Sequence, residues 1–339
     1  MTGDGTSWHS SKAVELPYEA CFINQKFDFA TMNSADPPVD PVKSEQYDNL
    51  MLFYTGLGGV SWRNNDNWGY GDPCYFSWYG LECDCDGLVT KMILPDNRLV
   101  GEIPEALGAL VSLREIHLQT STKLMQSYVN FDANKLTGTI PSLSELTNLQ
   151  VLDVSQNLLE GWPADLNLNV NLEVLNAAGN KLTGFPASLG DLTNLRILEL
   201  NDNLIDAEFP LADVCALSNV YILNFGNSSM SGPLYDDCLQ GLNPLIFDVS
   251  APHPAALGYG AGLTGEVPVD LIESWTNIKQ GYLSVYLQFG LSGQIPETCS
   301  DLRFCRWYQF GSHRDLAWTE GGAEVPDYVY ETIDVALEH

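Results

Sequence analysis

Short runs in which apolar and polar residues alternate recur along most of the chain at a nearly fixed spacing. In the segment LTNLQVLDVSQNLLEGWP, Leu152 and Val154 flank the polar Asp153, which predicts a short strand with one face turned inward. Each run leads to an asparagine that opens a stretch such as NKLTGTIPSL; these are Asn97, Asn134, Asn157, Asn180 and Asn203. Three successive spacings are 23 residues (157 minus 134, 180 minus 157, 203 minus 180), which indicates a solenoid of stacked coils.

A single coil of this kind cannot bury its apolar face, so neighbouring coils must supply the rest of the core. We expect each coil to add one strand to a parallel sheet and one layer to a continuous interior. The asparagine at each turn is expected to be buried, bonded to backbone groups of its own and the next coil. The Gly and Pro that follow are expected to turn the chain onto the convex side.

The repeats resemble the plant-type leucine-rich repeat consensus LxxLxxLxLxxNxLxGxIPxxLxxL from about Val89 to Trp307. The segment YDNLMLFYTGLGGVSWRNNDNWGYGDPCYFSWYGLECD resembles the N-terminal cap of that family, with a helix, a Trp-rich turn and a Cys pair around W-x-G. The resemblance implies an α/β solenoid, a curved horseshoe of about eight coils with a parallel concave sheet and a cap at each end. It also implies a secreted or cell-surface recognition protein, such as a plant receptor-like kinase ectodomain or an inhibitor of cell-wall polygalacturonases.

The chain divides into five parts on this basis. They are an extended arm (1–43), an N-terminal cap (44–88), the repeats (89–307), a C-terminal cap with an acidic tail (308–336) and the remnant of an expression tag (337–339).

Within the N-terminal cap, we expect a helix that Ser44 caps and Gly56 ends, covering the open end of the core. Trp62, Trp68 and Trp78 are expected to fill the same cap.

Equivalent strand positions can be aligned along the repeats. We place them at Met92, Ile116, Leu152, Leu175, Leu198, Leu223, Phe247 and Val285. Two steps are longer than the others, which predicts insertions near 119–133 and 250–262 that emerge on one edge of the solenoid. An alternative strand around Val129 and Phe131 would replace the one at Ile116.

Eight cysteines indicate four disulfides and an oxidising compartment, with free thiols as the alternative. The resemblance implies a bridge around the W-x-G, and stacking predicts a second between adjacent coils. The expected pairs are Cys74–Cys83, Cys215–Cys238, Cys299–Cys305 and Cys21–Cys85, with a swap among Cys21, Cys74, Cys83 and Cys85 left open.

The net charge of -29, from 15 basic and 44 acidic residues, argues against nucleic acid or an anionic membrane as the partner. A basic or neutral protein or peptide fits better, and simple solubility is the alternative explanation of the charge. No apolar run is long enough to insert into a membrane within this region. The start lacks an apolar signal region, so we expect an excised mature region whose native signal peptide or anchor lies outside it.

Two columns of side chains are predicted on the concave sheet, one polar and one aliphatic. The polar column comprises Ile93, His117, Asp153, Asn176, Glu199, Asn224, Asp248 and Tyr286, and the aliphatic column comprises Val151, Val174, Ile197, Ile222 and Ile246. Acids on every second strand lie about 10 Å apart, which is too far to share a metal ion. We predict a ligand site along both columns, with Tyr221 beside them; strand preference alone is the alternative reading of the aliphatic column.

Catalytic motifs are absent from the sequence, so we predict a non-enzymatic protein without a cofactor or metal. Asn227 heads the one glycosylation sequon, Asn-Ser-Ser. The predicted function is recognition of a peptide or protein on the concave face. A structural subunit of an extracellular or lumenal assembly and a glycan-binding or glycanase-inhibiting protein are the alternatives.

Overall fold

The computed structural model describes eight ranges of the chain. They are 41–121, 133–234, 237–251, 262–266, 269–278, 282–285, 290–292 and 304–306. The predicted arm up to residue 40, most of both insertions, the alternative strand around Val129, the C-terminal cap and tail, and the tag remnant lie outside these ranges.

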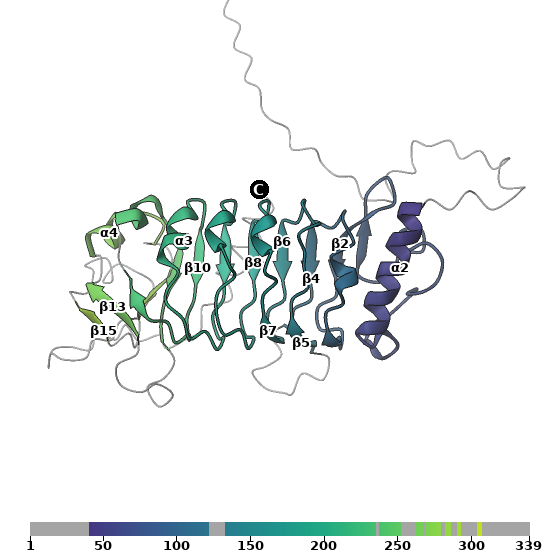
Figure 1. The fold of residues 1–339 in the computed structure, drawn as a ribbon, viewed down its shortest axis with the longest axis horizontal. Coiled ribbons are helices and arrows are strands. Elements are labelled where there is room, and N and C mark those ends of the chain that lie inside the picture. The colour runs from purple at the N-terminus through teal and green to yellow at the C-terminus, as the bar shows by residue number, and fades with distance from the viewer. Residues whose placement is uncertain are drawn as a thin grey trace, which may run out of the picture.

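Within the described ranges, a sheet of ten strands runs along the stack of coils (Figure 1). Nine strands are parallel, one for each coil, and the first pairs antiparallel with the second as part of the cap. In spatial order the strands are β1 (Leu81–Cys83), β2 (Val89–Ile93), β4 (Glu115–His117), β6 (Val151–Asp153), β8 (Val174–Asn176), β9 (Ile197–Glu199), β10 (Ile222–Asn224), β12 (Ile246–Asp248), β14 (Tyr282–Ser284) and β16 (Phe304–Arg306). The solenoid predicted from the repeats is therefore confirmed, with β16 as a strand that the alignment had not placed.

Two further short sheets form beyond the large sheet, the first of them directly after the buried Asn97, Asn134 and Asn157. One comprises β3 (Val100–Glu102), β5 (Lys135–Thr139) and β7 (Leu158–Gly161), and the other comprises β11 (Gly232–Pro233), β13 (Leu263–Glu266) and β15 (Gly290–Ser292). The sequence had suggested only a turn at this Gly-Pro segment. The difference arises because stacked coils bring these segments side by side, where their backbone groups pair.

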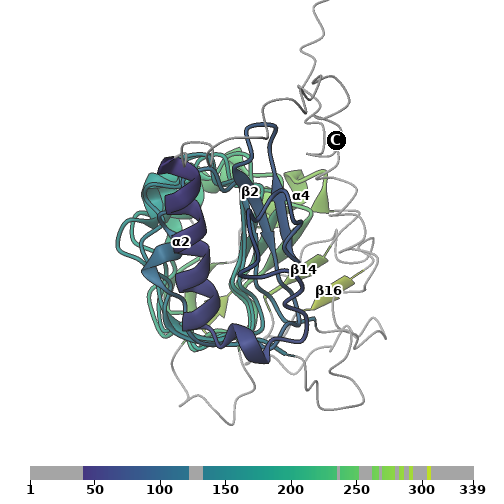
Figure 2. The same ribbon diagram turned by 90° about the vertical axis from the view of Figure 1, so that its right-hand side faces the viewer.

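Helical connections lie on the side opposite the large sheet in most of the described coils, as the view along the stack shows (Figure 2). They are short: α3 (Leu211–Ala216), α4 (Val269–Ser274), η3 (Glu105–Leu107), η5 (Leu166–Leu168), η6 (Leu189–Asp191) and η7 (Asp237–Gly241). One leucine of each coil, such as Leu107, Leu166 or Leu189, is buried from this side. Sheet and connections together enclose one apolar core.

The asparagine ladder is buried and fully bonded. Asn180 accepts a hydrogen bond from the Leu159 backbone N–H (2.9 Å) and donates to the carbonyls of Val154 and Ala177 (both 3.1 Å). Asn157 and Asn203 repeat this pattern in their own coils. Each side chain therefore ties its own coil to the preceding one, which confirms the predicted role, although the bonds reach backward rather than forward.

The N-terminal cap is built on helix α2 (Pro41–Gly56), which covers the first coil (Figure 2). The helix begins at Pro41, so the predicted start at Ser44 was wrong; proline is favoured in a first helical turn because it lacks the N–H that stays unbonded there. Gln46 ties the helix to the first coil, since its side chain accepts from Val89 N–H (2.7 Å) and donates to Gly87 carbonyl (3.2 Å).

Tryptophans fill the cap as predicted. Trp62, Trp68 and Trp78 are buried, and successive ring centroids lie 5.0 Å apart. Tyr54 of α2 stacks on Trp68 with centroids 5.5 Å apart. This aromatic cluster shields the end of the core that has no preceding coil.

Two of the predicted disulfides are present in the described ranges. Cys74 bonds Cys83 within the cap, and Cys215 bonds Cys238 between adjacent coils, with a Cα–Cα distance of 5.4 Å in the second. The first bridge settles the connectivity left open for those two residues. Cys85 is also disulfide-bonded. Its predicted partner Cys21 lies outside the described residues, as does Cys299, the predicted partner of Cys305.

Candidate functional site

The concave sheet carries the two predicted columns in register. Parallel pairing aligns Asp153 with Asn176, Asn176 with Glu199, Glu199 with Asn224 and Asn224 with Asp248. The same pairs of strands align the aliphatic column, Val151, Val174, Ile197, Ile222 and Ile246. The structure therefore brings together all but one of the residues predicted for the two columns, with Tyr221 directly before Ile222.

The exception is Tyr286, which lies outside the described residues. β14 pairs Leu283 with Phe247 and Ser284 with Asp248, so the predicted equivalent position, Val285, is two residues too late. Leu283 and Val285 are both buried because each strand has two inward positions, and the alignment took the second for the first. Ser284 rather than Tyr286 therefore continues the polar column.

Most of the aliphatic column is closed to solvent. Val174, Ile197, Ile222 and Ile246 are buried in a cluster with Leu245, separate from the main core. Val151 and Tyr221 are partly buried at its margin. The predicted open apolar stripe is therefore wrong for these four residues, and a lysine at Ile197 would disturb folding. Contact with a ligand is available first at Val151.

Short polar side chains in the polar column have a structural task. Each accepts a hydrogen bond from the backbone N–H two residues later and so fixes the turn that follows its strand. The four side chains are Asp153, Asn176, Asn224 and Asp248, with N···O distances of 3.0, 3.1, 3.2 and 2.8 Å. Their presence in the column needs no ligand to explain it.

Glu199 interrupts this pattern. It is 5% exposed, and its carboxylate lies beside the Asn224 side chain, with which it is hydrogen-bonded. Within the described part of the chain its other oxygen, Oε1, is buried without a hydrogen-bond partner. Burial, reinforced by the negative charge of Asp153 and opposed by the Asn224 hydrogen bond, raises the pKa of Glu199 to about 7.

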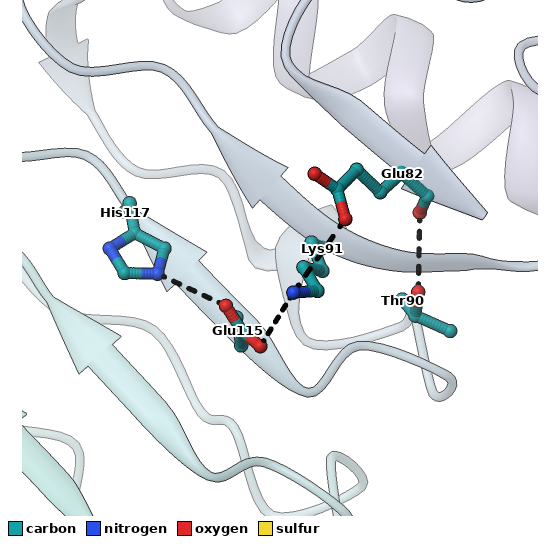
Figure 3. A network of polar contacts seen from close by, with 5 residues as sticks. All are labelled: Glu82, Thr90, Lys91, Glu115 and His117. Atoms are coloured by element: carbon teal, nitrogen blue, oxygen red, sulfur yellow. Dashed lines mark hydrogen bonds and ion pairs between the residues drawn. The ribbon is translucent and has the colours of Figure 1, made fainter. Parts of the chain in front are cut away.

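A partly exposed charged cluster precedes the aliphatic column on β2 and β4 (Figure 3). Lys91 Nζ lies 2.9 Å from Glu115 Oε1 and 3.6 Å from Glu82 Oε2, and Glu115 Oε2 lies 3.4 Å from His117 Nε2. The hydrogen bond with His117, together with Lys91, lowers the pKa of Glu115 to about 2. The next acid, Asp153, follows one strand away.

The sequence analysis missed Lys91 and Glu115 because it followed the aliphatic column only from Val151 onward. Register pairs Lys91 with Glu115 and Glu115 with Val151, so both belong to it. The alignment of Met92 with Ile116 and Leu152 was enough to place them there. The accessible part of the concave face thus runs over β2, β4, β6 and β8 and is largely polar.

Asn227 is exposed at the turn after β10, where its amide donates to Asp202 Oδ1 at 2.9 Å. The sequon is therefore sterically accessible, and glycosylation itself stays a prediction.

In the ranges that the structure describes, no three metal-ligating side chains are grouped. The described helices include none with the length and apolar character needed to cross a bilayer.

Two receptor-like kinases of Arabidopsis thaliana are among the proteins with similar sequences. The family described as "Leucine Rich repeats (2 copies)" matches residues 170–213. Receptor-like kinase TMK2 of Arabidopsis thaliana is 30% identical over 145 residues, 43% of this chain and 13% of that protein. The probable receptor-like kinase At1g67720 of the same species is 34% identical over 94 residues, 27% of this chain and 9% of that protein. This chain thus corresponds to a small part of either relative.

Solved structures share the fold. A plant ice-binding protein is similar with a TM-score of 0.56 and 21% identity over 78% of both chains. The Arabidopsis receptor kinase HAESA, in complex with the peptide hormone IDA and the co-receptor SERK1, is similar with a TM-score of 0.51 and 27% identity over 78% of this chain and 46% of that one. Taken with the repeats and the disulfide-bonded cap, these likenesses identify the chain as a leucine-rich repeat protein similar to the ectodomains of plant receptor-like kinases.

Proposed function

We propose that this chain is a non-enzymatic recognition module that binds a peptide or protein segment across the accessible part of its concave sheet. The observation that carries the proposal is the in-register array of partly exposed polar groups on β2, β4, β6 and β8. It runs from Lys91 and Glu115 through His117 and Asp153 to Asn176. Rungs about 4.8 Å apart offer an extended chain regularly spaced donors and acceptors.

The class of ligand is supported by the comparison with HAESA, whose solved complex contains a peptide hormone. The disulfides support a secreted or cell-surface location, since such bonds persist in oxidising compartments. The excess of acidic residues favours a basic or neutral ligand through long-range attraction.

Changing Val151 to lysine tests the location of the site. Val151 is partly buried on β6, so the new ammonium group can reach solvent while obstructing the concave face. We expect Val151→Lys to weaken, by at least about tenfold, the binding of peptides selected from a displayed library of linear peptides. Fluorescence anisotropy of a labelled selected peptide gives the affinity.

Leu158→Lys is the matched control, because Leu158 is 36% exposed and lies on β7, in the short sheet formed by β3, β5 and β7. We expect it to bind the peptide as the native protein does. Equal weakening by both variants would place the site elsewhere. A selection that yields glycan ligands on an array and no peptide would favour the glycan-binding alternative, and a selection that yields neither would favour a structural subunit.

A further inference from the structure

Glu199 is the acidic member of the polar column that holds no turn; the neutral Ser284 Oγ is likewise buried without a partner among the described residues. Its four neighbours in the column, Asp153, Asn176, Asn224 and Asp248, each hold the backbone of their own turn. Glu199 has one more methylene and holds no turn, yet its carboxylate is buried and Oε1 has no partner among the described residues. Burying a carboxylate without an opposite charge is unfavourable, so the group either holds a proton or pairs with a cation that a ligand can supply.

The surroundings of Glu199 match a side chain with an alkyl stem and a cationic end. Val174, Ile197 and Ile222 form the apolar cluster of the adjoining column. Asn176 and Asn224 lie on the neighbouring strands in register with Glu199. Arginine and lysine combine an apolar stem with a charge in this way. The acids Asp153 and Asp248 lie about 10 Å away on either side of Glu199. They add negative potential at the cationic group without contacting it.

We propose that Glu199 determines the specificity of the concave face by receiving the cationic group of an arginine or lysine side chain of a bound peptide. This inference rests on the proposed function. The peptide backbone lies over the accessible rungs of β4, β6 and β8. Because Glu199 is only 5% exposed, the basic side chain must displace the cover over its carboxylate, approaching from Asn176, the partly exposed neighbour one rung, about 4.8 Å, away.

Selection from a displayed library of linear peptides tests the proposal, with the native protein and Glu199→Gln as separate targets. We expect peptides selected on the native protein to be enriched in arginine or lysine and to bind Glu199→Gln at least about tenfold more weakly. Replacing the conserved basic residue of a selected peptide by citrulline, which keeps the shape of arginine without its charge, should weaken binding to the native protein to the same extent. It should change binding to Glu199→Gln little.

Glu145→Gln is the matched control, because Glu145 is exposed in the connection between β5 and β6. It should bind the selected peptides as the native protein does. Peptides that depend on Val151 but bind Glu199→Gln with native affinity, or that lack basic residues, would overturn this inference and leave the proposed function standing. A failure of any peptide to bind the native concave face would remove both. Glutamine keeps the shape of glutamate, and a cooperative unfolding transition with a native circular dichroism spectrum confirms that the variant folds.

Discussion

Asn180→Ala should lower the free energy of unfolding by at least about 3 kcal/mol, because several buried backbone groups lose their partners at once. The Leu159 N–H loses its acceptor, and the carbonyls of Val154 and Ala177 lose a donor. No water can reach these groups inside the stack without opening it. Urea denaturation with the disulfides intact gives the free energy, and the midpoint should fall sharply.

An exposed asparagine provides the control for this prediction. Asn194 also bonds across coils, donating to the Val170 carbonyl at 2.8 Å, but it lies on the surface where water replaces the lost donor. Asn194→Ala should therefore cost under about 1 kcal/mol. Similar losses for Asn180→Ala and Asn194→Ala would show that the buried ladder does not hold the coils together.

Glu199→Gln should change how stability depends on pH. Burial raises the pKa of Glu199 to about 7 in the folded protein, against 4.5 for an unperturbed glutamate. The folded state therefore holds this proton more tightly than the unfolded state does. Its contribution to stability is fully present below pH 4.5 and is lost as the pH rises through 7. The shift corresponds to roughly 3 kcal/mol between these limits.

The difference between the native protein and Glu199→Gln isolates this contribution, since other groups titrate in both. Asp153 on β6 and Asp248 on β12 are the acids of the column on either side, and the Asn224 amide on β10 is neutral. Relative to the variant, the native protein should lose stability between pH 4.5 and 8. Parallel stability curves over this range would mean that the carboxylate is not held in a desolvated site. Glu145→Gln should parallel the native curve.

The fold could be predicted from the sequence because one physical constraint repeats in every coil. Leu152, Leu175 and Leu198 recur at a fixed spacing, and the structure pairs them directly. After the second insertion, where the spacing between strands is longer, the predicted strand position was wrong. Alternation with a period of two cannot distinguish Leu283 from Val285, and only the strand register of the structure identifies Leu283. The two short sheets were missed because their strands lie in segments whose Gly and Pro residues predicted a turn.

The columns of the candidate site followed from strand alignment, but their exposure did not. Alternation shows that Ile197 and Ile222 point away from the main core, and it cannot show that a second cluster buries them. Nor could the sequence distinguish Glu199 from the other acids of its column. That distinction needs hydrogen-bond geometry, which assigns Asp153 and Asp248 to their own turns and leaves Glu199 Oε1 without a partner in the described residues.

Photo-crosslinking tests most directly the claim that the concave sheet captures a peptide. A peptide selected on the native protein is made with a benzophenone at each position in turn, and mass spectrometry maps the crosslinked residues. We predict crosslinks on β4, β6 and β8, with the position nearest the basic residue of the peptide reaching Asn176 or the residues beside Glu199. Crosslinks confined to helix α2, the two short sheets or the helical connections on the convex side would contradict the account.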